Sequence, residues 1–183
     1  RLVRENPVRP LTGEDLERAF RGARERGHEG LVLKRSDAFY EAGRRTGSWI
    51  KVKRAFATLD CVITAAEEGS GKRAGVWSDY TFAVRDDVTG ELVNIGKAYS
   101  GLTDEEIETL TARLRKMTLD RFGRVRLVRP EIVLEIAFDG VQKSARHKSG
   151  FALRFPRIAR LRDDKPASDA DTLATVRAIY AAQ

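Results

Sequence analysis

Residues 103–117 read TDEEIETLTARLRKM and predict an amphipathic helix with a defined start. Thr103 and Glu106 have the spacing of a capping box, in which each side chain bonds the backbone amide of the other residue. The apolar residues that follow at helical spacing are Ile107, Leu110, Leu114 and Met117. One face of this helix should therefore be buried.

Strand-like runs lie on both sides of this helix, three before it and two after it. They are expected near residues 58–66, 77–85, 91–99, 131–138 and 152–162. A Gly-containing hairpin loop, DDVTG, joins the second run to the third. Three strands, a helix and two strands is the order of the five-stranded OB-fold barrel, which often binds nucleic acids. An SH3-like barrel is the competing architecture, and the capped helix favours the OB-fold.

The first 54 residues predict one helix and two strands. Thr12 can cap a helix over residues 13–26, and short strands are expected at residues 30–35 and 48–53. So few elements cannot enclose a core, so this segment should belong to a larger domain. The chain starts at Arg1 without an initiator Met, and we expect it to be part of a longer protein.

Charge divides the chain in the same place. Residues 1–54 carry 14 basic and 8 acidic side chains, whereas residues 55–183 carry 20 and 19. We therefore place a domain boundary near Arg54. The predicted fold class is mainly β or α+β: an incomplete domain over 1–54, then an OB-fold domain over 55–183 that ends in a docking helix at about 169–181.

Composition limits the partners and the compartment. The net charge of +7 and the pI near 9.8 favour an anionic partner such as nucleic acid or a nucleotide, although a solvated basic surface would give the same charge. The single cysteine, Cys61, excludes an internal disulfide. We see no signal peptide and no apolar stretch near 18 residues. We expect a soluble cytoplasmic protein without a membrane partner, associated with the nucleoid if the source is prokaryotic.

Two lysines share one face of a short strand in WIKVK, residues 49–53. Strand alternation places Lys51 and Lys53 on the face opposite Ile50 and Val52. Neighbouring ammonium groups repel each other unless an anion lies between them, and a phosphate would serve. The alternative is an edge strand with a solvated basic face.

A carboxylate precedes the other strand of this segment in EGLVLK, residues 29–34. Glu29 lies at the start of the strand, where it could hold a hard cation such as Mg²⁺, and Lys34 lies at the far end. An exposed Glu before a core strand would have the same sequence.

Basic residues are dense in residues 143–165, with eight Lys or Arg and two acids. This density suits a pyrophosphate or a DNA backbone. The polar loop over 142–150 is expected to be mobile, and His147 within it has no acidic or nucleophilic neighbour in sequence, so we interpret it as a surface residue. The Gly-rich GSGKRAG at 69–75 lacks the Gly-Lys-Ser/Thr ending of a phosphate loop and is predicted to be a basic loop between strands.

The order of these segments resembles that of ATP-dependent DNA ligases. Residues 29–34 resemble nucleotidyltransferase motif IV, residues 49–53 resemble motif V in its DNA-ligase form, and residues 152–165 are similar to ligase motif VI. LDCVI at 59–63 and GKRAG at 71–75 also resemble ligases of the replicative-like type. The resemblance covers nearly the whole chain and implies the end of an ATP-grasp-like nucleotidyltransferase domain followed by an OB-fold.

The resemblance implies a role for individual residues, with ATP and Mg²⁺ as cofactors and nicked duplex DNA as a partner. Glu29 would bind the metal. The nucleotide-binding set would be Glu29, Lys34, Arg45, Lys51 and Lys53. The phosphate-orienting catalytic set would be Lys51, Lys53, Arg154, Arg157, Arg162 and Lys165. The DNA-facing candidates are Lys72, Arg73, Lys143, Arg146 and Lys148.

The chain departs from the family in one respect. The ligase nucleophile lies in a Lys-x-Asp-Gly motif, but the only Asp-Gly here is Asp139-Gly140, which Ala137 and Phe138 precede. The isolated chain should therefore not form an enzyme adenylate, and the missing N-terminal part of the same protein would be its partner. An RNA ligase or capping-type enzyme, a non-catalytic nucleic-acid-binding OB module, and a plain structural domain are the alternatives.

Overall fold

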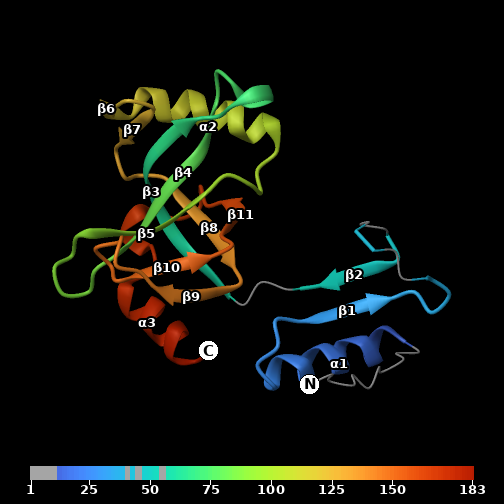
Figure 1. Cartoon of the computed structure of the whole chain (residues 1–183). Coiled ribbons are helices and arrows are strands. Elements are labelled where there is room, and N and C mark those ends of the chain that lie inside the picture. The colour runs from blue at the N-terminus through green and yellow to red at the C-terminus, as the bar shows by residue number, and fades with distance from the viewer. Residues whose placement is uncertain (1–11, 40–41, 44–46, 54–56) are drawn as a thin grey trace. The chain divides into compact units, whose positions relative to one another are not determined.

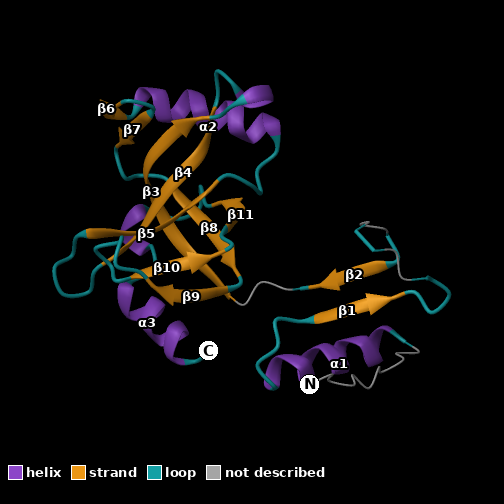
Figure 2. Cartoon of the chain, viewed as in Figure 1, coloured by secondary structure: helices purple, strands orange, loops and turns teal. Residues whose placement is uncertain are grey.

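The computed structural model describes residues 12–39, 42–43, 47–53 and 57–183. The chain divides into two compact units, Arg1–Arg54 and Ala55–Gln183. Figures 1 and 2 show a helix with a two-stranded ribbon in the first unit and a strand-rich domain in the second. Among the described residues, no helix combines the length and the apolar character needed to cross a membrane.

The first unit contains α1 (Gly13–Glu25), β1 (Leu31–Lys34) and β2 (Trp49–Val52), as the sequence predicts. Thr12 and Asp15 form a capping box at the start of α1. Phe20 of α1 is buried and lies against Gly30, where an added Cβ would come within 2.2 Å of the carbonyl oxygen of Val52. Only glycine fits there, so Gly30 lets the ribbon lie close to the helix.

The second unit is built on β3 (Ala57–Glu68), which pairs antiparallel with three other strands. β4 (Trp77–Arg85) lies on one side and continues to β5 (Leu92–Ala98), while β8 (Val133–Phe138) lies on the other side and continues to β11 (Arg157–Leu161). Leu59, Cys61 and Ile63 of β3 face the main core, whereas Val62 packs on the opposite side with Val133 and Ala170.

The capped helix is α2 (Asp104–Lys116), with the predicted Thr103–Glu106 capping box. Its face of Ile107, Leu110 and Leu114 is buried. The side-chain oxygen of Thr111 accepts a 3.0 Å hydrogen bond from the backbone amide of Trp77, which links α2 to β4. The C-terminal helix α3 (Leu173–Ala181) buries Leu173 and Val176. The OB-fold prediction is confirmed by this domain.

Three details differ from the five predicted strands. A hairpin, β6 (Thr118–Phe122) and β7 (Val125–Val128), lies between α2 and β8, and β7 extends the pairing of β3. The last predicted strand is divided into β10 (Phe151–Arg154) and β11, because Phe155 has a φ of 50° and Pro156 has no amide hydrogen for a ladder. The loop predicted to be mobile begins as β9 (Gly140–Lys143), which pairs with β10.

Candidate functional site

Four side chains share one face of the β1–β2 ribbon. Antiparallel pairing sets Val32 opposite Lys51 and Lys34 opposite Trp49. The Lys34 ammonium lies 4.5 Å from the centroid of the Trp49 ring, which is the contact expected of a cross-strand pair on one face. Lys51 is exposed on this face. The ribbon therefore presents positive charge beside apolar side chains.

The end of the ribbon carries an ion pair. Lys53 lies one residue beyond β2, and its ammonium is 2.5 Å from a carboxylate oxygen of Glu29. Both side chains are largely accessible to solvent, so the pair is weak as a source of stability. It places the predicted metal-binding carboxylate next to a predicted phosphate-binding lysine.

Glu29 fits Mg²⁺ only as one ligand among several. The described part of the chain holds no group of three His, Cys, Asp or Glu side chains that could enclose a metal. Mg²⁺ usually retains several waters and takes one or two carboxylates together with phosphate oxygens. A single accessible carboxylate beside a predicted phosphate-binding lysine meets that requirement, whereas a closed protein cage is not present among the described residues. Arg45 lies outside the described residues.

The predicted phosphate-orienting residues of the barrel form two separate groups. Arg154 ends β10 and is exposed, while Arg157 begins β11 and pairs with Asp139 at 3.2 Å. Arg162 and Lys165 follow the other end of β11. Arg157 and Arg162 are five residue steps apart along the strand, which is about 16 Å at the usual rise per residue.

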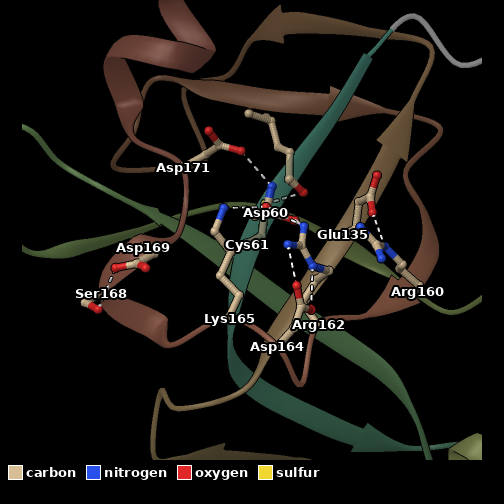
Figure 3. A network of polar contacts seen from close by, with 11 residues as sticks. Asp60, Cys61, Glu135, Arg160, Arg162, Asp164, Lys165, Ser168, Asp169 and Asp171 are labelled. Carbon is tan, nitrogen blue, oxygen red and sulfur yellow. Dashed lines mark hydrogen bonds and ion pairs between the residues drawn. The ribbon is translucent and has the colours of Figure 1, made fainter.

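Asp60 of β3 holds the second group together (Figure 3). Nη1 of Arg162 lies 2.9 Å from both carboxylate oxygens of Asp60, and Nζ of Lys165 lies 2.7 Å from one of them. Asp164 accepts two further bonds from the same guanidinium, from Nε at 2.8 Å and from Nη2 at 2.9 Å. This hydrogen bonding lowers the pKa of Asp164 to about 2.

Sequence reasoning missed the role of Asp60. The residue lies between the buried Leu59 and Cys61 and is 9% exposed. A carboxylate inside an apolar strand is costly to bury without paired cations, so LDC was a signal that basic partners lie nearby. The sequence contained that signal but did not identify which cations pair with Asp60.

The DNA-facing candidates also form two groups. Lys72 and Arg73 lie in a one-turn 3-10 segment after β3, where Nη1 of Arg73 donates to the carbonyl of Tyr99 at 2.9 Å. Lys143 ends β9, and Arg146 and Lys148 lie in the β9–β10 turn. All of these lysines, and Arg146, are exposed.

The β9–β10 turn is held by specific bonds. Ser144 N–H donates to the carbonyl of Gly150 at 2.8 Å, and the Ser144 hydroxyl lies 2.8 Å from Nδ1 of His147. The buried hydroxyl of Ser149 bonds the carbonyl of Asn94 in β5 at 2.9 Å. The turn thus lies against β5, away from the segment that follows the end of β3.

Two family descriptions match the chain. One, the ATP dependent DNA ligase C terminal region, matches residues 73–165, and another, the ATP dependent DNA ligase domain, matches residues 9–53. A "Probable DNA ligase" of Koribacter versatilis is 54% identical over 183 residues, which is all of this chain and 31% of that protein. The "DNA ligase 1" of Korarchaeum cryptofilum is 47% identical over 157 residues, 86% of this chain and 29% of that protein.

Solved structures agree. The ligase domain of M. tuberculosis LigD has a TM-score of 0.55 and 26% identity, covering 88% of this chain and 52% of that chain. The structure named Pmar-Lig_PreS3 has a TM-score of 0.62 and 27% identity, covering 81% of this chain and 30% of that chain. The chain spans about a third of the length of the two ligases from Koribacter and Korarchaeum. With more than half of its residues matched by one family description, the chain belongs to the ATP-dependent DNA ligase family.

Proposed function

We propose that this chain is the phosphate- and DNA-binding part of a ligase that seals nicks in duplex DNA. In that reaction a lysine elsewhere in the full-length protein attacks the α-phosphorus of ATP, loses a proton and releases pyrophosphate. The AMP then passes to the 5′-phosphate of the nick, and the 3′-hydroxyl displaces it to form the phosphodiester bond. Positioning and charge neutralisation dominate such phosphoryl chemistry.

The observation that carries this proposal is the lysine-bearing face of the β1–β2 ribbon beside one accessible carboxylate. Lys51 and Lys53 would contact the α-phosphate, and Lys34 would lie at the far end of the same ribbon. Glu29 would provide one ligand to Mg²⁺, which when bound neutralises phosphate charge. A solvated edge strand would not need the Glu29 carboxylate next to Lys53.

The barrel would serve the other phosphates and the DNA. One pair, Arg154 and Arg157, lies at the start of β11, and the other pair, Arg162 and Lys165, follows its end. Because the two pairs are far apart, they would act on the β- and γ-phosphates at different oxygens or at different steps. Lys72, Lys143, Arg146 and Lys148 are exposed, and they would bind DNA phosphates without reading sequence. Arg73 would support Lys72 through its bond to Tyr99.

The first test uses labelled ATP with Mg²⁺. The 183-residue chain should remain unlabelled because its sequence has no Lys-x-Asp-Gly, whereas the full-length protein should be labelled and should seal a nicked duplex. A covalent label on the 183-residue chain would contradict the proposal. Binding of nicked DNA by a full-length protein that is never labelled would favour a non-catalytic OB module.

The second test separates the ribbon from general charge. In the full-length protein, Lys51→Ala should slow self-adenylation by about a hundredfold or more, as loss of a phosphate-stabilising group does. Lys116→Ala removes an exposed lysine from α2 and should have little effect. Equal effects of Lys51→Ala and Lys116→Ala would refute the ribbon's role.

For DNA binding, each of Lys72→Ala and Lys148→Ala should weaken affinity and reduce the slope of log affinity against log salt by about one.

A further inference from the structure

We propose that Asp60 is a positioning residue for the adenylation step, which fixes the Lys165 ammonium for phosphate while Arg162 serves as a brace rather than as a phosphate ligand. This inference rests on the proposed function. It assigns different tasks to two cations that the motif VI resemblance treats alike, and it gives a role to a carboxylate that the resemblance leaves without one.

The position of Asp60 is fixed through its backbone as well as its carboxylate. Its amide donates to a carboxylate oxygen of Asp171 at 2.7 Å, and the Asp171 amide donates back to the Asp60 carbonyl at 2.8 Å. These bonds tie β3 to the segment that precedes α3. On the same face, Val62 packs against Ala170. The carboxylate of Asp60 therefore projects from a rigid part of the barrel, which a positioning group requires.

The guanidinium of Arg162 has all three nitrogen atoms bonded to carboxylates. Nη1 bonds Asp60, and Nε and Nη2 bond Asp164. Its side chain is only 16% exposed. These bonds use up to four of the five N–H donors of the guanidinium, so a phosphate could bind it in the bidentate manner typical of arginine only by displacing one of the two carboxylates. Arg162 is thus suited to bracing β3 against the end of β11.

Lys165 differs from Arg162 both in how many of its hydrogen-bond donors are used and in how exposed its side chain is. An ammonium has three donors, and the bond to Asp60 uses one of them. Its side chain is 27% exposed, compared with 16% for Arg162. Lys165 can therefore bind a phosphate oxygen while Asp60 still holds it. The residue that sets where this ammonium lies is Asp60, because Lys165 itself is on a turn after β11 and its stem is flexible.

The chain provides a matched control on the neighbouring strand. Glu135 of β8 is the register partner of Asp60, and its carboxylate pairs with the guanidinium of Arg160 at 2.6 Å (Figure 3). Arg160 is 59% exposed. Glu135→Gln therefore removes one negative charge and one carboxylate–guanidinium contact next to Asp60, without removing any bond that the structure gives to Lys165.

The main experiment compares Asp60→Asn with Glu135→Gln in the full-length protein. Asp60→Asn should reduce kcat/KM for self-adenylation by ten- to a hundredfold, because β- and γ-phosphates are present only in that step. Sealing of a nick that already carries a 5′-adenylate should change less than about threefold. Glu135→Gln should change neither rate more than about threefold. Equal losses in both steps, or equal losses in both variants, would reduce Asp60 to a structural role.

A double variant guards against misfolding as the cause. If Asp60 acts through Lys165, then Asp60→Asn combined with Lys165→Ala should adenylate no more slowly than Lys165→Ala alone. Multiplying losses would show that Asp60 acts independently and would overturn the inference. If Lys165→Ala itself leaves adenylation unchanged, the proposed function of Lys165 fails first. The two failures are therefore distinguishable.

A measurement on the 183-residue chain needs no activity. Trace acylation of lysines, read by mass spectrometry, should modify Lys165 several-fold more slowly than the exposed Lys72 and Lys148 of the same molecule. Asp60→Asn should raise the modification rate of Lys165 several-fold relative to those references, whereas Glu135→Gln should not. An unchanged relative rate in Asp60→Asn would show that Asp60 does not hold this ammonium.

Discussion

The ribbon and the barrel hold their phosphate-binding candidates in different ways. At the end of the β1–β2 ribbon, Lys53 meets Glu29 through a largely accessible pair just outside strands of four residues each. In the barrel, Lys165 meets the carboxylate of Asp60, whose side chain is 11% exposed, on a strand of 12 residues. The first arrangement leaves its cations adaptable, while the second fixes them.

This difference suggests a division of work. Under the proposed function, a lysine that follows a phosphate through bond breaking benefits from a weak, exchangeable partner, and Glu29 would be such a partner for Lys53. A cation that sets the orientation of a leaving group benefits from a rigid support, and Asp60 supplies it. The comparison can be tested at the level of the backbone, of the core, of the ion pairs and of the acid titration.

Hydrogen exchange of the 183-residue chain should show the largest contrast. Amides of Cys61, Val62 and Ile63 lie in β3, with strands on both sides, and their side chains are 0% exposed. Among the described residues, β1 and β2 pair only with each other. We expect the β3 amides to exchange at least about a thousandfold more slowly, because they open only with the barrel. Similar rates in β2 and β3 would remove the contrast.

Truncation of core side chains should also distinguish the barrel from the ribbon. Leu134→Ala empties a fully buried position of β8 and should destabilise the barrel by about 2–5 kcal/mol. Leu33→Ala in the half-buried ribbon should leave barrel unfolding unchanged. The thiol of Cys61 reports barrel unfolding selectively, because burial raises its pKa in the folded barrel and only the thiolate reacts readily. Thiol labelling should therefore accelerate in Leu134→Ala alone, and acceleration in Leu33→Ala would link the two units energetically.

The fold was largely predictable because its signals are local. The Thr103–Glu106 capping box, the helical spacing after it and the apolar strands each fix one element. The β6–β7 hairpin was missed, since TLDRFGRVRLV has exposed apolar residues and arginines instead of a clean alternation. The division at Phe155 was missed as well, because a left-handed φ at a non-glycine residue is set by its surroundings.

The site was predictable as a set of residue types but not as a set of contacts. The paired lysines of WIKVK are evident from strand alternation. The partnership of Asp60 with Arg162 and Lys165 spans more than 100 residues of sequence, and pairing across such a distance follows from the strand order alone. Periodicity gave no register between β3 and the end of β11, so Asp60 could not be assigned.

The ion pairs give the next contrast. Asp60→Ala would leave the Lys165 ammonium without its carboxylate partner and Arg162 with Asp164 alone, at a poorly accessible position, and we expect a loss of about 2–4 kcal/mol in barrel stability. Glu29→Ala breaks an accessible pair and should cost less than about 1 kcal/mol. Denaturant unfolding of the 183-residue chain, with the labelling of the Cys61 thiol as the probe of barrel unfolding, measures the stability loss in Asp60→Ala. A cost for Asp60→Ala as small as that for Glu29→Ala would mean that solvent screens both pairs equally.

The acid titration should show the smallest effect. A hydrogen bond from Arg162 lowers the pKa of Asp164 to about 2, below the value near 3.9 of an unfolded chain. A carboxylate with a lowered folded-state pKa contributes stability above the unfolded value, and that contribution is lost as the pH falls from about 4 to about 2. Asp164→Asn should therefore flatten the fall in barrel stability over that window. Asp37, whose pKa is lowered by Arg35 in the first unit, provides the control, since Asp37→Asn should leave the barrel's acid transition unchanged. An equally steep fall in Asp164→Asn would show that Arg162 depends on Asp60 alone, and the brace would then have one carboxylate instead of two.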